Sequence, residues 1–340
     1  MGDPAGIGPD ITLKAWAERK IQSLPPFYVI ADADLLTQRA GIVDCASKLA
    51  VLDETMAADP LGWSEYVAGQ FPAALPVLHR PVDATIVAGT PNVQSAENVI
   101  ASIDQAIGHI RTGHASAMVT NPIAKDVVYR AGFKHPGHTE YLAERANQHW
   151  GGHHRPVMMI AADEMRVVPV TIHIPLKDVP TALTKELIVD TVGVTARALK
   201  EDFGIKTPKV ACTGLNPHAG ENRSIGTEDN TIIAPAIATL RDAGHDVEGP
   251  FPADTIFHAE TRAPYDAIVA MYHDQALIPI KTLAFDRAVN VTLGLPFIRT
   301  SPDHGTAFGI AGTGNANPGS LIEAIKLAAR MAAARAGQDA

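Results

Sequence analysis

Three histidines follow apolar, strand-like runs of the sequence, namely His173, His218 and His273. Because the carboxyl ends of parallel strands meet at one edge of a sheet, side chains far apart in the sequence can converge there. Three imidazoles can hold a borderline divalent metal such as Zn²⁺ and leave positions open for substrate oxygens. The chain has 14 histidines, so the alternative is that each of the three is a surface residue or a hydrogen-bonded core residue.

Two further groups of polar residues indicate anion binding. His138 and Thr139 stand at the expected start of a helix, where free N–H groups and the helix dipole attract anions. Simple N-capping by Thr139 is the alternative. Lys281, Asn290 and Arg299 flank or occupy the last expected strand, and in an acidic chain they can bind a phosphate or a carboxylate. For the two cations, structural ion pairing is the alternative.

A glycine-rich segment near the C-terminus precedes an expected helix. Glycines let a backbone approach a ligand closely, and a helix start binds pyrophosphate. The candidate cofactor-binding residues are Asp303, His304, Gly305, Thr306, Gly312, Gly314 and Asn317. Their spacing is not the G-x-G-x-x-G fingerprint of a first strand and helix, so the residues alone also fit an ordinary loop.

Alternating strand-like and helix-like runs must position these residues, and this pattern is typical of an α/β fold with a mainly parallel sheet. Strands are expected over residues 27–31, 49–52, 115–120, 166–174, 209–213, 267–272 and 288–293. Helices are expected over residues 9–19, 96–112, 139–149, 185–203, 230–243 and 319–334. The proline-rich stretch 52–93 is expected to form a hairpin excursion or a lid. The chain opens directly into a Gly/Pro turn, so we expect a strand to precede it.

Composition narrows the classes of function. Hydrophobic residues make up 46% of the 340 residues and charged residues 19%, a balance that excludes extensive disorder. A net charge of -9 repels nucleic acid and anionic membranes, so neither is expected as a partner. The apolar runs are too short for a membrane span, and only two cysteines occur, which favours a reducing compartment, the cytoplasm.

Taken together, the motifs resemble one family, the 4-hydroxythreonine-4-phosphate dehydrogenases of pyridoxal phosphate biosynthesis. The resemblance rests on Gly2-Asp-Pro-Ala-Gly-Ile-Gly-Pro-Asp10, Gly137-His-Thr-Glu140, Leu215-Asn-Pro-His-Ala-Gly-Glu221, Tyr272-His-Asp-Gln275, Leu293-Gly-Leu-Pro-Phe-Ile-Arg299 and Asp303-His-Gly-Thr-Ala307. It implies two α/β/α subdomains with a mainly parallel sheet and an intervening cleft, as in isocitrate and isopropylmalate dehydrogenases. Residues 1–112 and 288–340 would form an outer subdomain with the cofactor loop. Residues 113–287 would form a central subdomain with the metal ligands and the dimer interface.

The resemblance also implies roles for individual residues. It implies a homodimer with a shared active site, in which His173, His218 and His273, not all from one chain, hold the metal. It implies that the substrate is bound by His138, Thr139, Lys281, Asn290 and Arg299. Asp254 falls where the family has an acidic residue at the site. The general base stays open between Lys281, with a lowered pKa, and Asp274, beside a metal ligand.

The expected reaction is oxidation of 4-phosphohydroxy-L-threonine at C3, followed by decarboxylation to 3-amino-2-oxopropyl phosphate. The expected cofactor is NAD or NADP, and the expected metal is Zn²⁺, with Co²⁺, Mn²⁺ or Mg²⁺ as alternatives. Three other functions stay open. They are a paralogue that oxidises D-threonate or D-erythronate 4-phosphate, a zinc hydrolase, and a non-catalytic protein that binds a phosphorylated metabolite.

Overall fold

The computed structural model describes residues 1–43, 45, 47–56, 59–135 and 137–337. The chain divides into two compact units. Unit 1 comprises Met1–His154 and Leu295–Arg330, and unit 2 comprises Arg155–Gly294 with the end of the C-terminal helix from Met331. Each unit is built of helices packed on a mainly parallel sheet, which confirms the expected α/β class.

Unit 1 contains two parallel strand groups. Its helices are α1 (Gly8–Ala17), α2 (Ala33–Ile42), α3 (Pro60–Gln70), α4 (Ala96–Arg111), α5 (Lys125–Arg130), α6 (His138–Trp150) and most of α13 (Gly319–Ala336), with short 3₁₀ turns at Glu54–Met56, Val93–Ser95 and Phe308–Ile310. Its strands are β1 (Val29–Ala31), β2 (Leu49–Val51), β3 (Leu75–His79), β4 (Ala117–Val119) and β11 (Ile298–Pro302). The first three form a sheet in the order β1-β3-β2, and β4 pairs in parallel with β11.

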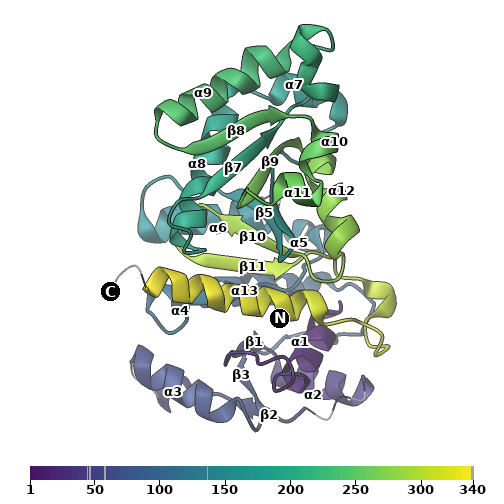
Figure 1. The fold of residues 1–340 in the computed structure, drawn as a ribbon. Coiled ribbons are helices and arrows are strands. Elements are labelled where there is room, and N and C mark those ends of the chain that lie inside the picture. Colours follow the sequence, from purple (N-terminus) through teal and green to yellow (C-terminus); the bar gives the residue numbers. More distant parts are fainter. Residues whose placement is uncertain (44, 46, 57–58, 136, 338–340) are drawn as a thin grey trace. The chain divides into compact units, whose positions relative to one another are not determined.

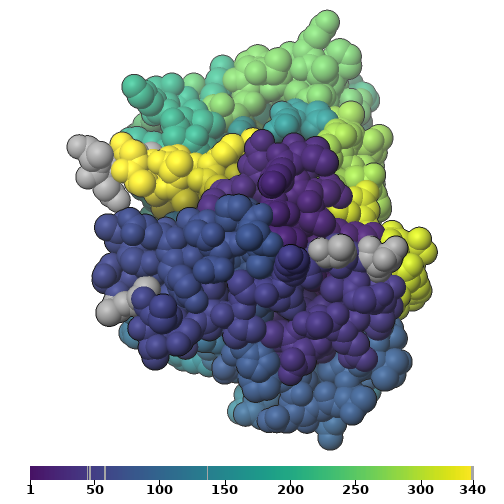
Figure 2. Space-filling view, turned by 90° about the horizontal axis from the view of Figure 1, so that it is seen from below, coloured from purple at the N-terminus to yellow at the C-terminus, as the bar shows by residue number. Residues whose placement is uncertain are grey.

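In the sheet of β1, β3 and β2, successive side chains point to opposite faces, and both faces are buried by helices. Val29, Ala31 and Val77 pack with residues of α1, α2 and α13, whereas Ile30 and Leu78 pack with residues of α3. Figure 1 shows α1 and α2 on one side of this sheet and α3 on the other. In Figure 2 the early part of the chain, coloured purple to blue, forms most of the face that is seen from below.

Unit 2 contains a larger sheet. Its strands are β5 (Val157–Ala162), β6 (Met165–Thr171), β7 (Lys209–Thr213), β8 (Asp246–Phe251), β9 (Ala267–Tyr272) and β10 (Val289–Leu293), in the order β10-β5-β6-β9-β7-β8. Its helices are α7 (Val179–Ala182), α8 (Lys185–Glu201), α9 (Ala234–Asp242), α10 (Ala253–Ile256), α11 (Ala259–Arg262) and α12 (His273–Ala284), with 3₁₀ turns at Leu176–Asp178 and Pro217–Arg223 and a π-turn at Asp229–Ile233. Helices α8 and α9 lie on one face of the sheet, and α10 to α12 lie on the other (Figure 1).

The seven expected strands and six expected helices all appear, with ends that differ by a few residues. Pro235 lies in the first turn of α9, where its missing N–H leaves no hydrogen bond of that helix unmade. The expectation of a hairpin or lid over residues 52–93 was wrong, because this stretch forms α3 and then β3, which pairs in parallel with β1. Helix α12 was not expected, since no element was assigned to residues 273–284.

The unit boundaries differ from the expected subdomains. Residues 113–154 were assigned to the central subdomain, but they group with unit 1. The physical reason is pairing and packing, since β4 pairs with β11 and residues of α6 share a core with Phe297. Likewise, residues 288–294 belong to unit 2, because β10 pairs with β5.

Across the part of the chain that the structure describes, no helix combines the length and the apolar character needed to cross a bilayer.

Candidate active site

Two of the three candidate metal ligands lie together in unit 2. His173 follows β6 and His273 opens α12 directly after β9. The two strands are parallel neighbours, with Thr171 in register with Tyr272, so the residues after them leave the sheet side by side. The imidazole rings have centroids 5.6 Å apart. Such a separation suits two imidazoles that bind one ion.

The side chain of Asp274 orients one of these rings. Its Oδ1 lies 2.9 Å from Nδ1 of His273. With Nδ1 hydrogen-bonded to a carboxylate, Nε2 of His273 is the nitrogen available to a metal, an arrangement that is frequent around metal-binding histidines. The pair therefore fits a metal centre that needs further ligands.

His218 does not join this pair to form a complete metal site in the single chain. Among the described residues, no group of three or more His, Cys, Asp or Glu side chains is placed to hold a metal ion. His218 is exposed and begins a run of six residues with positive φ, from 53° at His218 to 77° at Arg223. A run of left-handed residues that are not all glycine is strained, and such strain is concentrated at functional sites.

A buried carboxylate holds the loop that carries His218. Asp229 is fully buried and accepts hydrogen bonds from the backbone N–H of Leu215 at 2.8 Å and from Nδ2 of Asn216 at 2.8 Å. Gly220 packs against the same carboxylate, and a Cβ there would lie 3.2 Å from Oδ2. Asp229 was not among the predicted residues; its only signal is the acidic pair Glu228-Asp229 shortly after the loop motif.

Gln275 connects the ends of two neighbouring strands. Its Oε1 accepts hydrogen bonds from Oγ1 of Thr213 at 2.7 Å and from the backbone N–H of Met271 at 2.8 Å. Its Nε2 donates to the carbonyl of Gly214 at 2.8 Å. Gln275 thus fixes the start of α12, where His273 lies, against the end of β7.

Helix α12 presents a mixed stripe to solvent. Asp274, Ile278, Lys281 and Phe285 are spaced by four, three and four residues, which places them on one helix face. Ile278 is 65% exposed and Phe285 is 73% exposed. Asn290 is half-buried in β10, and Asp254 is exposed at the start of α10. Both candidate bases, Lys281 and Asp274, therefore lie on a face that could meet another protein.

A buried cation lies in unit 1. Arg299 in β11 is 4% exposed, and its Nη2 and Nε donate to Oγ1 of Thr120 at 2.6 and 3.1 Å. Burial lowers the pKa of Arg299 to about 10, so the guanidinium still carries its charge at neutral pH. A charged group held in this way is suited to bind an anion.

His138 lies in the same electrostatic environment at the first residue of α6. Its Nε2 is enclosed and has no hydrogen-bond partner among the described residues, although the residue as a whole is only partly buried. Burial, followed by the positive charges of Arg299, Lys125 and the terminal amine of Met1, holds the pKa of His138 well below its ordinary value. Thr139, half-buried, is the second residue of α6. A neutral imidazole, cations and a helix start thus form an anion-binding environment, and Lys125 is an addition to the predicted set.

The candidate cofactor segment of unit 1 is tied to the first loop of the chain. Asp10 is fully buried, and its Oδ2 accepts the backbone N–H of Gly312 at 2.7 Å, while its Oδ1 accepts Nη1 of Arg39 at 2.7 Å. Arg39 also donates to the carbonyls of Gly6 and Pro4, each at 3.0 Å. This buried ion pair therefore joins both glycine-rich loops.

Lys14 and Thr306 strengthen this connection. Nζ of Lys14 donates to the carbonyls of Gly314 and Ala316. The carbonyl of Thr306 accepts the N–H of Ile7 at 3.0 Å. Gly312 and Gly314 have φ of 73° and 78°, which favours glycine at both positions.

The remaining predicted cofactor residues have varied environments. Oδ1 of Asn317 accepts the N–H of Gly319 at the start of α13, and the N–H of Asp303 donates to Oγ of Ser320 at 3.1 Å. Nε2 of His304 is enclosed and has no partner among the described residues. A Cβ on Gly305 would meet no atom within 4 Å, so packing does not require glycine there. Glycine at position 305 would let a ligand approach the backbone closely.

The chain is similar in sequence and in fold to known proteins. Residues 23–328 match the family model of the pyridoxal phosphate biosynthetic protein PdxA. A 4-hydroxythreonine-4-phosphate dehydrogenase from Bradyrhizobium diazoefficiens is 56% identical over 98% of this chain and 96% of its own length. A crystal structure of the enzyme of the same name from Klebsiella pneumoniae superposes with a TM-score of 0.85 at 36% identity, over 98% of this chain and 96% of that one.

A terephthalate 1,2-cis-dihydrodiol dehydrogenase from Burkholderia xenovorans is less similar, with a TM-score of 0.63 and 27% identity over 97% of this chain and 96% of that one. The family match spans most of the chain, and the similarity to relatives extends over nearly all of it. The chain therefore belongs to the PdxA family of pyridoxal phosphate biosynthesis, a family of oxidoreductases.

Proposed function

We propose that this protein oxidises 4-phosphohydroxy-L-threonine at C3 with NAD⁺ or NADP⁺, and that the resulting β-keto acid loses CO₂ to give 3-amino-2-oxopropyl phosphate. The observation that carries the proposal is the 56% identity, over nearly the whole chain, to a relative of that name. The anion-binding environment of His138 and Arg299 supports a phosphorylated substrate. The similarity to relatives of this name does not support a zinc hydrolase or a non-catalytic binding protein.

A divalent metal fits the histidine pair of unit 2. His173 and His273 would hold it, with Asp274 orienting the ring of His273. When bound, the metal supplies Lewis acidity to the hydroxyl that is oxidised and to the negative charge that develops on decarboxylation. We propose Zn²⁺ first, with Co²⁺, Mn²⁺ or Mg²⁺ as alternatives, because imidazoles favour the borderline metals.

We propose that His218 completes the site across a homodimer interface. The exposed stripe of α12 supports this, since Ile278 and Phe285 are large apolar side chains with 65% and 73% exposure. Ile174 and Leu176, directly after His173, are 41% and 66% exposed. Large apolar groups around a half-complete metal site are expected where a second copy binds.

The chain's own residues then have distinct tasks. Arg299, with Thr139, Lys281 and Asn290, would bind the phosphate and the carboxylate of the substrate, and neutral His138 would hydrogen-bond to a substrate oxygen through Nε2. Either Lys281 or Asp274 would accept the hydroxyl proton, and Asp254 would assist from α10. Residues 303–317 would bind the nicotinamide cofactor next to the start of α13. The free thiols of Cys45 and Cys212 support a cytoplasmic location.

A direct assay tests the reaction. Protein loaded with Zn²⁺ is mixed with 4-phosphohydroxy-L-threonine and either NAD⁺ or NADP⁺, and reduced nicotinamide is followed by absorbance. We expect turnover that a chelator abolishes and added metal restores. Turnover only with D-threonate or D-erythronate 4-phosphate would replace the substrate. Hydrolysis without any reduction of the cofactor would overturn the oxidoreductase.

Mixing two inactive variants tests the shared site. His218→Ala and His273→Ala are each expected to be inactive, but a hybrid dimer contains one site with both native histidines if the two come from different chains. Co-expressed, differently tagged variants purified through both tags should regain about half the native activity per dimer. The control carries both substitutions in one tagged chain, paired with the same chain under the second tag. An inactive hybrid dimer would place both histidines in one chain.

A further inference from the structure

The loop that carries His218, residues 214–226, contains a strained turn. Residues 218–223 all have positive φ, and five of these six residues are not glycine. A left-handed backbone is unfavourable for L-amino acids, so each of these five positions opposes the conformation. Backbone hydrogen bonds from Ala219 to Asn216 at 3.1 Å and from Ile225 to Gly220 at 3.2 Å offset part of this strain. The rest must be offset by contacts with the surrounding structure.

Asp229 supplies such contacts from outside the loop. Its side chain is fully buried. Oδ1 accepts the backbone N–H of Leu215 at 2.8 Å, and Oδ2 accepts the backbone N–H of Asn216 at 3.3 Å and its Nδ2 at 2.8 Å. Both oxygens of a carboxylate accept hydrogen bonds, whereas an amide side chain accepts through only one atom. A carboxylate is therefore the group that can hold these three donors together.

Two glycines bring the backbone of the loop close to this carboxylate. A Cβ on Gly214 would overlap with Oδ1 of Asp229, and a Cβ on Gly220 would lie 3.2 Å from Oδ2. The carboxylate thus contacts both the residue that begins the loop and the turn itself, two residues after His218. Because these contacts are close, a displacement of Asp229 would also displace the turn.

Asp229 is attached to a well-packed helix. It is the first residue of the π-turn Asp229–Ile233, which leads directly into α9. Ile233 and Ala236 are fully buried, and Leu240 is 2% exposed. π-turns within helices occur frequently at functional sites, and close packing permits little movement. Asp229 therefore connects the strained turn to the core of unit 2.

A second side chain connects the same loop to His273. Nε2 of Gln275, two residues after His273 in α12, donates to the carbonyl of Gly214 at 2.8 Å. Gly214 therefore lies between Gln275 and Asp229. Through these contacts, the loop that carries His218 and the helix that begins with His273 are held in one arrangement within the chain.

We propose that Asp229 is a positioning residue for metal binding, which holds the turn 218–223 in the conformation that presents His218 to the metal. This inference rests on the proposed function, in which His218 is a metal ligand. Because Asp229 is fully buried and its oxygens accept donors of the loop, it acts through His218 and is not itself a ligand. Groups that orient a metal ligand typically change the metal affinity by about 10- to 100-fold.

The zinc affinity of three variants tests this role. Asp229→Asn, His218→Ala and the double variant are prepared as full chains, and the Kd for Zn²⁺ is measured by competition with a chromophoric chelator. We expect Asp229→Asn to weaken binding by at least about tenfold and His218→Ala to weaken it further. In the double variant the loss should equal that of His218→Ala alone, because Asp229 acts through that histidine. A merely structural role would make the two losses add.

Hydrogen exchange locates the change in the loop. The backbone amides of Leu215 and Asn216 donate to Asp229, so both should exchange at least about tenfold faster in Asp229→Asn than in the native chain. This readout requires neither bound metal nor catalysis.

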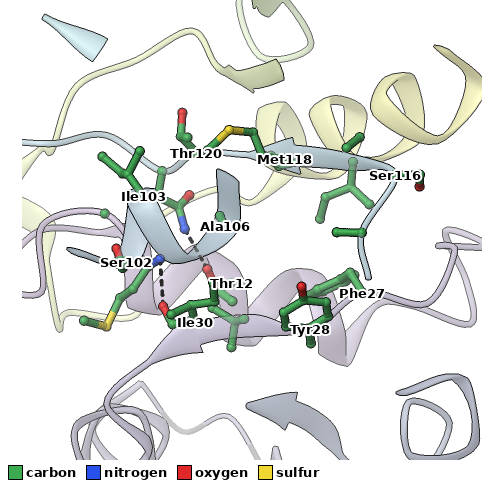
Figure 3. A pocket seen from close by; sticks show the side chains of 18 of the residues that line it. Thr12, Phe27, Tyr28, Ile30, Ser102, Ile103, Ala106, Ser116, Met118 and Thr120 are labelled. Carbon is green, nitrogen blue, oxygen red and sulfur yellow. Dashed lines mark hydrogen bonds between the residues drawn. The ribbon is translucent and has the colours of Figure 1, made fainter. Parts of the chain in front are cut away.

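Two control variants remove buried interactions elsewhere. Asp202→Asn, in unit 2, weakens the ion pair of a buried carboxylate with Arg335. Thr12→Val, in unit 1, removes a hydroxyl that accepts Nδ2 of Asn121 at 2.8 Å. Figure 3 shows Thr12 beside a cavity of about 360 Å³. Both variants are expected to lower the Tm, because each loses a buried interaction, and to leave the Kd for Zn²⁺ unchanged.

Gly220→Ala perturbs the same contact without changing the carboxylate, and it serves if Asp229→Asn does not fold. Its control is Gly244→Ala, because Gly244 also has a positive φ, 89° against 78°, but a Cβ there meets no atom within 4 Å. Both substitutions carry a similar backbone strain, so the contact with Asp229 is what distinguishes them. We expect Gly220→Ala to weaken zinc binding several-fold and Gly244→Ala to leave it unchanged.

Native zinc affinity in Asp229→Asn and Gly220→Ala, together with weak binding by His218→Ala, would overturn the positioning role and leave the proposed ligand intact. Losses that add in the double variant would also overturn it, because Asp229 would then not act through His218. Zinc affinity that does not change in His218→Ala would instead contradict the proposed function, and the positioning role would fall with it.

Discussion

His138 combines a buried imidazole with several positive neighbours, and this has a consequence for stability. Its pKa in the folded chain is well below the ordinary value of 6.5. Below about pH 6.5 the unfolded chain therefore binds a proton that the folded chain does not, and the free energy of unfolding falls as the pH falls. Above that pH both states are neutral at this residue and its contribution is constant.

We expect the Tm of the native chain to fall more steeply between pH 7 and pH 5 than that of His138→Asn, measured by calorimetry in matched buffers. Subtracting the variant from the native chain removes the contribution of the Met1 amine, whose lowered pKa acts in the same direction. Parallel curves for the two chains would mean that folding does not lower the pKa of His138.

At the scale of elements, α1 controls the glycine-rich loop before α13. Lys14 in α1 donates to the carbonyls of Gly314 and Ala316, so one charged side chain of α1 holds two carbonyls of this loop. Lys14→Met keeps the length of the side chain and removes both hydrogen bonds. Hydrogen bonds from charged groups contribute about 1.5 to 3 kcal/mol, so a loosened loop is expected to raise the KM for the nicotinamide cofactor by about tenfold.

The measurement is steady-state kinetics with each substrate varied in turn. The KM for the phosphorylated substrate should change little, because the hydrogen bonds of Lys14 go to carbonyls of the glycine-rich loop and not to the anion-binding residues. Lys20→Met is the matched control, since Lys20 is an exposed lysine shortly after the same helix. Equal increases in both KM values would indicate general unfolding and contradict a specific role of the loop.

At the scale of the whole molecule, the exposed apolar stripe of α12 predicts the oligomeric state. Phe285→Asp places a charge on that stripe, and burying an unpaired charge in an interface is strongly unfavourable. We expect this variant to be a folded monomer by light scattering and circular dichroism, with dehydrogenase activity reduced at least about a hundredfold, because the metal site would be incomplete.

Ile21→Asp is the control for this substitution, because Ile21 is 86% exposed in unit 1, away from α12 in the sequence. It should leave mass and activity unchanged. A monomeric Phe285→Asp protein with full activity would contradict the shared site, and a dimeric one would place the interface elsewhere.

The sequence by itself determined the α/β class, seven of the strands, six of the helices, and the residues at strand ends where chemistry was expected. These follow from local hydrophobic periodicity and from turn residues, which depend on neighbours in the sequence. Thus β7, β9 and α4 lie within one residue of their expected bounds. Family membership was also readable, because several motifs occur in a fixed order.

Only the tertiary structure decided which of those residues meet. The parallel register of β6 and β9 brings His173 to His273, whereas His218, on an equally suggestive motif, does not complete their site within the chain. The ion pair of Asp10 and Arg39 and the hydrogen bonds that Asp229 accepts from the His218 loop join residues that are apart in the sequence. No local sequence pattern indicated these contacts. Strand pairing also decided that residues 113–154 belong to unit 1, since β4 and β11 are far apart in the sequence but adjacent in the sheet. Contacts of this kind depend on the free energy of the whole fold, and local residue spacing does not specify them.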